Sequence, residues 1–191
     1  MTETSAAPEP FLKAVAALRS VRPRPELHLA EVPPPKRLAP WSFAITAEVS
    51  GPGDGDDGAL ATGRLVLLHD PDAQEAWDGE LRVVAYVRAE LDAEFASDPL
   101  LPEVGWSWLT DALEAAGAKY TALGGTVTDT SSARFGDISG PARTDDLELR
   151  ASWTPLDSDL APHGEAFCEL MASVVGLPPV GVVMFGQRKA D

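Results

Sequence analysis

The sequence predicts an α+β fold, in which a mostly antiparallel sheet of about six strands packs with three helices. Apolar residues recur at helical spacing in three segments, and they alternate with polar residues in segments between these. The predicted order of elements is α-β-β-β-β-α-β-β-α. A chain of 191 residues is long enough to bury a sizeable core. We therefore expect one domain over residues 10–179, with a disordered tail at 1–9 and a second tail at 180–191.

Three segments have the periodicity of helices. On a wheel with about 100° per residue, the segment 10–21 places five apolar side chains on one side: Phe11, Leu12, Ala14, Val15 and Leu18. In the segment 104–116, apolar residues that include Val104 cover about half of the circumference, so we expect this helix to be packed on more than one side. The segment 160–176 has the clearest apolar face.

Two segments alternate apolar and polar residues, as strands with one covered face do: 42–49 and 146–153. Residues 65–68 and 83–87 are instead apolar on both faces. We expect these two to pair as a hairpin, in the centre of a sheet that is covered on both sides or that meets another subunit.

Weaker strand candidates lie at 26–32 and 120–129. A helix, a strand, a polar loop and an alternating strand occur at 10–50 and again at 103–154, and we treat a structural repeat as a hypothesis.

The chain is strongly acidic, with 15 Lys and Arg against 30 Asp and Glu. Such a body repels phosphates, so we do not expect it to bind nucleic acid. The apolar run at 174–185 is broken by two prolines and is too short to span a bilayer, so no membrane association is expected. A single cysteine, Cys168, and an N-terminus without the pattern of a signal peptide favour a cytoplasmic protein.

No common catalytic or cofactor motif occurs, and we expect neither a cofactor nor a metal. The most polar cluster begins at His69, Asp70 and Asp72, in the loop of the expected hairpin. A carboxylate beside His69 would fix the tautomer of a general base, although adjacent strand residues point to opposite faces. A calcium loop starting at Asp70 lacks the required glycine and glutamate. The cluster is therefore either a polar loop cap or a small-ligand pocket.

The five tryptophans are more informative, since each must cover its ring. Trp108 and Trp153 lie on predicted inward faces. Trp77 falls in the acidic loop and Trp106 at the boundary of a helix face, which makes both of them candidate contacts for a protein partner. Trp77 has an alternative role as a lid over its own loop.

Three strings resemble an actinobacterial family catalogued as domain-of-unknown-function family 3000: VRPRPELHLAEVPPPKRLAP, LATGRLVLLHDPDAQEAWDGELRVVAYVRAEL and DPLLPEVGWSWLTDAL. The resemblance runs from Phe11 to about Pro179 and implies an actinobacterial cytoplasmic protein, but no activity or site. By element order, the chain is also similar to small acidic dimeric chaperones of type III secretion, which have one fewer strand before the middle helix.

These observations predict a non-enzymatic protein-binding or regulatory module. Its partner would be another protein, or a second copy in a homodimer, that contacts the central hairpin and the region of Trp77 and Trp106. The alternative is an enzyme or a small-ligand-binding protein with a polar pocket near His69.

Overall fold

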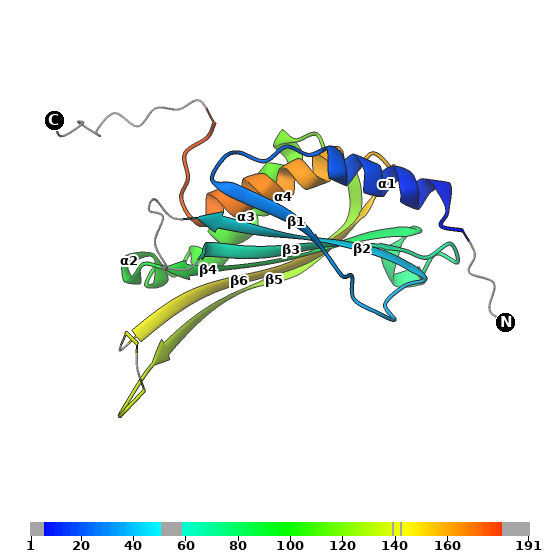
Figure 1. The fold of residues 1–191 in the computed structure, drawn as a ribbon. Coiled ribbons are helices and arrows are strands. Elements are labelled where there is room, and N and C mark those ends of the chain that lie inside the picture. Colours follow the sequence, from blue (N-terminus) through cyan, green and yellow to red (C-terminus); the bar gives the residue numbers. More distant parts are fainter. Residues whose placement is uncertain (1–5, 51–58, 139, 142, 181–191) are drawn as a thin grey trace.

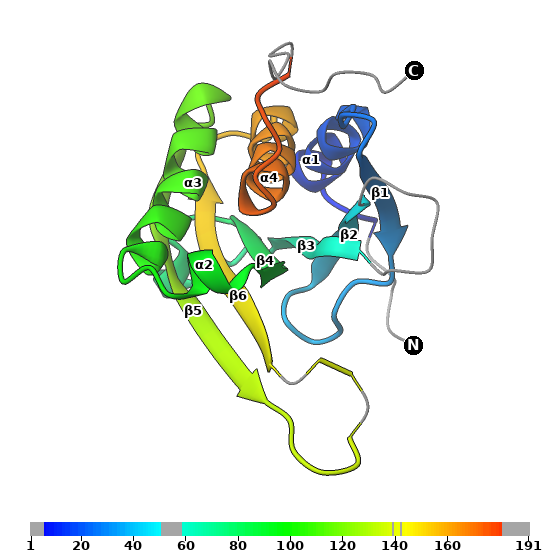
Figure 2. The ribbon, with the colours of Figure 1, turned by 90° about the vertical axis from the view of Figure 1, so that its left-hand side faces the viewer.

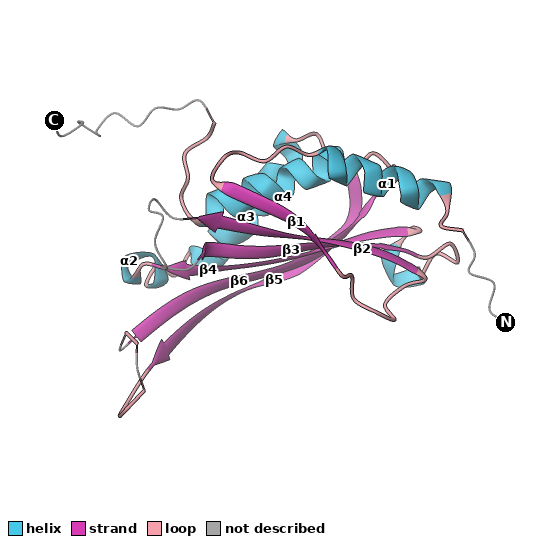
Figure 3. Cartoon of the chain, in the orientation of Figure 1, coloured by secondary structure: helices cyan, strands magenta, loops and turns pink. Residues whose placement is uncertain are grey.

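Six strands form one antiparallel sheet, and helices cover one of its faces (Figures 1 and 3). The computed structural model describes residues 6–50, 59–138, 140, 141 and 143–180. The strands are β1 (Leu27–Val32), β2 (Trp41–Ser50), β3 (Ala59–His69), β4 (Leu81–Leu91), β5 (Tyr120–Ala133) and β6 (Arg143–Pro155). The helices are α1 (Glu9–Ser20), α2 (Ala93–Ala96), α3 (Leu101–Ala115) and α4 (Ala161–Val174). The predicted α+β class and the order of the main elements are confirmed, and the short helix α2 is an addition.

The central position of the predicted hairpin is also confirmed. The strand order is β1-β2-β3-β4-β6-β5, so β3 and β4 occupy the middle of the sheet. Leu65 lies opposite Ala85, and Leu67 lies opposite Val83. The two outer edges are built alike, because α1 precedes the antiparallel pair β1–β2 at one edge and α3 precedes the pair β5–β6 at the other.

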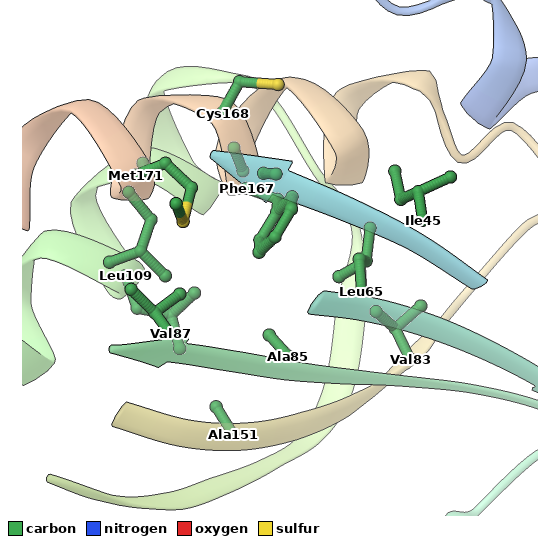
Figure 4. Close-up of a cluster of buried hydrophobic side chains, with 14 of the residues drawn as sticks. Ile45, Leu65, Val83, Ala85, Val87, Leu109, Ala151, Phe167, Cys168 and Met171 are labelled. Atoms are coloured by element: carbon green, nitrogen blue, oxygen red, sulfur yellow. The ribbon is translucent and has the colours of Figure 1, made fainter. Parts of the chain in front are cut away.

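The helix α4 lies over the middle of the sheet, between α1 and α3 (Figure 2). Gly63 of β3 allows this close approach, because a Cβ atom there would come within 2.9 Å of the Phe167 ring and would collide with the Met171 sulfur. The core forms where these layers meet. Figure 4 shows side chains of α3 and α4 directed towards the inward side chains of the sheet: Leu109, Phe167 and Met171 against Leu65, Val83 and Val87.

A smaller apolar cluster lies on the helix-free face of the sheet. It contains Ala44, Val66 and Leu68, against which the side chains of Trp77 and Ala39 pack. The expectation that both faces of the central hairpin are covered therefore holds at this cluster, where the loop around Ala39 and the single 3-10 turn η1 (Glu75–Trp77) provide the cover in place of an α-helix. Further along the same face the exposed side chains are charged, as at Arg88 and Glu90.

The structure corrects two expected core positions, since Leu12 is 54% exposed and Val104 is 40% exposed. The helix α1 packs mainly against α4, so the buried stripe is narrower than its apolar arc. Val104 lies in the first turn of α3, before Gly105 makes the close contact with the sheet. Much of the two predicted tails, at 1–5 and 181–191, lies outside the described residues.

Candidate functional site

His69 ends β3 with its side chain in the interior, 1% exposed. Its ring lies near the rings of Phe11 and Trp41, with centroid distances of 6.1 and 5.7 Å. Neither ring nitrogen has a hydrogen-bond partner among the described residues. The carboxylate of Glu80 lies 3.7 Å from Nε2, beyond hydrogen-bond distance. The histidine is therefore surrounded by aromatic side chains and not by other polar groups of the expected pocket.

Asp70 and Asp72 belong to the loop that follows. The Asp70 carboxylate accepts hydrogen bonds from the Asp72 backbone N–H at 3.1 Å and from Gln74 Nε2 at 3.0 Å. Asp72 itself is exposed. The carboxylate of Asp70 thus stabilises the turn, as in the loop-cap interpretation, and the structure does not bring His69, Asp70 and Asp72 together around one described cavity.

Trp77 and Trp106 are both partly buried by their own chain. Trp77 packs on the small cluster of the helix-free face, and the Thr154 hydroxyl donates a hydrogen bond to its backbone carbonyl. The Trp106 ring packs over β5 at Gly125, where a Cβ atom would come within 2.8 Å of it. Each ring keeps some exposed surface, so a role in partner binding stays a prediction for both.

Two other reactive side chains are buried in the core. Burial lowers the pKa of His163 to about 4, and its Nδ1 accepts a hydrogen bond from Trp153 Nε1. Burial raises the pKa of the Cys168 thiol to about 12. At neutral pH the histidine is uncharged and the thiol is protonated, so their states suit packing and not nucleophilic chemistry.

Charged side chains on the helix-free face pair with one another. Arg88 binds Asp146 through two hydrogen bonds, of 3.2 and 3.0 Å. Tyr86 donates to Glu148 at 3.0 Å, and Arg150 donates to the same carboxylate at 2.7 Å. The hydrogen bond from Arg150 lowers the pKa of Glu148, and burial raises the pKa of Tyr86. These contacts satisfy the charges across β4 and β6.

Apolar side chains are exposed at one end of the sheet, around α2 and the start of α3. Phe95 is 63% exposed and Leu100 is 59% exposed, and Val104 follows them. Beside them lies a cavity of about 140 Å³, and its apolar lining comes from α2, α3, β4 and the end of α4: Leu91, Phe95, Leu101, Trp108, Val174 and Val175. In Figure 1, α2 and the end of α4 lie at the same side of the molecule. We call Phe95, Leu100, Val104 and this cavity the α2 end.

The turn between α2 and α3 fixes the exposed residues in place. The Asp98 carboxylate accepts a hydrogen bond from the Leu100 N–H at 2.9 Å, and the backbone carbonyl of Asp98 accepts one from the Leu101 N–H at 3.1 Å. This turn directs Leu100 outward and Leu101 into the core. Sequence reasoning missed the α2 end, although the string FASDPLLP, with three large apolar residues in a short connection, contained the signal.

Acidic side chains line part of the cavity of the α2 end and occur on the segment beside it. Glu90 and Asp92 line it, and the exposed Glu94 and Asp98 belong to α2 and the turn after it. Among the residues that the structure describes, no group of three or more His, Cys, Asp or Glu side chains could hold a metal ion. No helix in the described ranges is long and apolar enough to cross a membrane.

Comparison with known proteins assigns the chain to a family but not to an activity. A family model described as "Protein of unknown function (DUF3000)" matches residues 7–183. No curated protein and no solved structure matches the chain. The similarity to type III secretion chaperones therefore stays a prediction from element order.

Proposed function

The chain belongs to the family of unknown function DUF3000, and we propose that it is a non-enzymatic protein-binding module whose partner docks at the α2 end. The observation that supports this most is the exposure of Phe95 and Leu100 beside an apolar cavity. Scattered exposed apolar residues are common on proteins, but large ones gathered next to a cavity are typical of binding surfaces. Trp77 and Trp106 stay predicted additional contacts.

The charges around the cavity define the partner that fits. Glu90, Asp92, Glu94 and Asp98 give the apolar surface an acidic rim on a chain with a net charge of −15. A complementary polypeptide would insert a large apolar side chain into the cavity and place Lys or Arg residues next to it. A lone cysteine is typical of reducing compartments, so we place this interaction in the cytoplasm.

The size of the cavity limits how the partner binds. A volume of about 140 Å³ accommodates one or two side chains and is smaller than the usual site of a small-molecule ligand. The exposed faces of Phe95 and Leu100 would supply the remaining contact area. This geometry favours a peptide anchor over a metabolite.

The experiment compares the full-length wild type with Phe95→Asp and Leu100→Asp in affinity capture followed by cross-linking mass spectrometry. Leu12→Asp is the matched control, because Leu12 is also a largely exposed apolar residue and belongs to α1, at the other end of the molecule from α2. We expect a partner that the wild type and the control capture, that both α2-end variants lose, and whose cross-links map to residues 90–104. Capture unchanged by Phe95→Asp and Leu100→Asp, or cross-links to another surface, would overturn the proposal.

A further inference from the structure

β1 is an edge strand with one free side. The Ser50 N–H donates to the Glu26 carbonyl at 3.1 Å, so these two residues form a hydrogen-bonded pair at the start of the β1–β2 ladder. Backbone groups of successive strand residues point to opposite sides. Leu27, Leu29 and Glu31 therefore direct their backbone groups away from β2, and no other described strand pairs with that edge. The Leu27 N–H already bonds to the Arg24 carbonyl.

A groove lies beside this edge, on the helix side of the sheet. Its volume is about 460 Å³, and its walls come from the end of α1, from β1 and from Ile45. The side chains of Leu27, Leu29 and Glu31 project to this side, where Leu18 and Val21 of the helix region face them. A strand added to β1 would thus gain backbone hydrogen bonds at the edge and apolar contacts in the groove.

We propose that the strand added here is β1 of a second copy, so that two sheets join antiparallel across a two-fold axis at Leu29. The two Leu29 residues then form a hydrogen-bonded pair, and Glu31 of each copy lies opposite Leu27 of the other. This arrangement uses the backbone groups that point outward on both strands, except the Leu27 N–H, which stays bonded to the Arg24 carbonyl. The contact is self-complementary, as a two-fold interface requires.

The charges and the free backbone groups together select this register. An axis at Leu27 would need the Leu27 N–H, which is already bonded to the Arg24 carbonyl. With Leu29 on the axis, the two Glu31 residues are four strand positions apart, or roughly 14 Å. Shifting the axis towards Glu31 would bring the two carboxylates together, which destabilises a strand pair. In the Leu29 register, Glu31 of the second copy lies opposite Leu27, which lines the groove together with Arg22. Each Glu31 also keeps its own Arg19, to which it is paired at 2.6 Å.

The opposite edge of the sheet is less suited to this contact. The outer part of β5 has small polar side chains, Thr128, Thr130 and Ser131 among them, and the cavity that Thr130 and Ser131 line together with β4, α2 and β6 is only about 20 Å³. A second copy pairing there would gain backbone hydrogen bonds but little apolar burial. Such a contact would depend on backbone hydrogen bonds alone, each of which contributes only about 1 kcal/mol net.

The test measures the mass of the full chain in solution and traps the predicted register. We expect the wild type to sediment at about twice the chain mass of 20.2 kDa and Leu29→Asp to be monomeric with an unchanged circular dichroism spectrum. Phe95→Asp, at the α2 end, is the control that keeps the dimer. Because Phe95 and Leu29 lie on separate surfaces, a failure here is distinguishable from a failure of the proposed function.

A cysteine pair tests the axis itself. Leu29→Cys places two thiols on the axis with Cα atoms about 5.5 Å apart, a separation that a disulfide bridges under mild oxidation. His28→Cys is the control, because its two copies would be roughly 8 Å apart in the same register. A monomeric wild type at about 100 μM, a dimer that Leu29→Asp leaves intact, or equal cross-linking of the two cysteine variants would overturn the inference.

Discussion

Trp153 of β6 and His163 of α4 are joined by a buried hydrogen bond of 2.9 Å, in which the indole Nε1–H donates to the imidazole Nδ1. Their rings also stack, with an interplanar angle of 24°. Because Nδ1 is the acceptor, the neutral histidine carries its proton on Nε2. The bond ties the helix α4 to the sheet at the point where the chain leaves β6, and it needs the neutral form of the histidine.

The first prediction follows from that requirement. Burial lowers the pKa of His163 to about 4, while nearby Asp157 and Asp159 raise it only in part. Below the usual pKa of about 6.5 the unfolded chain therefore binds a proton that the folded chain does not. The contribution of this group to the free energy of unfolding is complete above about pH 6.5 and is lost as the pH falls towards 4. The loss reaches about 2 kcal/mol by pH 5.

The variant His163→Gln separates this loss from that of other groups. Its amide oxygen accepts the hydrogen bond from Trp153, and the side chain does not titrate. We expect the variant to lose about 2 kcal/mol less than the wild type between pH 7.5 and pH 5, as measured by urea unfolding at several pH values. Parallel stability curves for the two proteins would contradict the assignment of the pH dependence to His163.

The second prediction concerns His69, whose two ring nitrogens are buried without a partner among the described residues. Phenylalanine has a similar shape, and its ring would lie between Phe11 and Trp41. We expect His69→Phe to raise the free energy of unfolding by about 1 kcal/mol, because it removes two unsatisfied polar atoms. The exposed His28 is the control, and His28→Phe should change stability by less than about 0.5 kcal/mol. Destabilisation by His69→Phe would show that a polar group binds the imidazole.

The third prediction concerns the contact between β3 and α4. A Cβ atom at Gly63 would collide with the Met171 side chain and come within 2.9 Å of Phe167. We expect Gly63→Ala to lower the free energy of unfolding by about 1–3 kcal/mol, the usual cost of overpacking a core. Gly124→Ala is the control, because nothing lies within 4 Å of the Cβ position there. Equal stability of the two variants in denaturant unfolding would contradict the tight packing.

The sequence predicts the elements of this fold well where one covered face imposes a clear period. Residues 146–153 alternate because β6 turns one side to the helices, and the burial of Leu147 and Leu149 follows that period. The periodicity of a helix reports an apolar arc but not what covers it, so Leu12 was expected in the core. The helix α2 is too short for any period to reveal it.

The candidate sites depend on contacts between distant segments, and these are not predictable from local patterns. The rings around His69 come from α1 and β2, and the cavity of the α2 end combines Phe95 with Val174 of α4. A polar string such as His69-Asp70 indicates neighbours in the chain only. Because β3 ends at His69, the His69 side chain points into the core, while Asp70 lies in the loop that follows.

The fourth prediction decides whether Trp77 acts as a lid or as a partner contact. Its ring packs on Ala44, Val66 and Leu68, which are buried although no α-helix covers them. If Trp77 is a lid, Trp77→Ala exposes this cluster and lowers the free energy of unfolding by about 2 kcal/mol, since the ring is only partly buried. Binding of the dye ANS, which reports exposed apolar surface, should increase in parallel.

Phe95→Ala is the control for this prediction, because Phe95 is a more exposed aromatic residue whose removal should change stability by less than about 0.5 kcal/mol. The two variants should thus have opposite effects: Trp77→Ala reduces stability and keeps partner capture, while Phe95→Ala keeps stability and reduces capture. The reverse pattern for Trp77, with unchanged unfolding and lost capture, would make its ring part of the binding surface and contradict its role as a lid over the central strands.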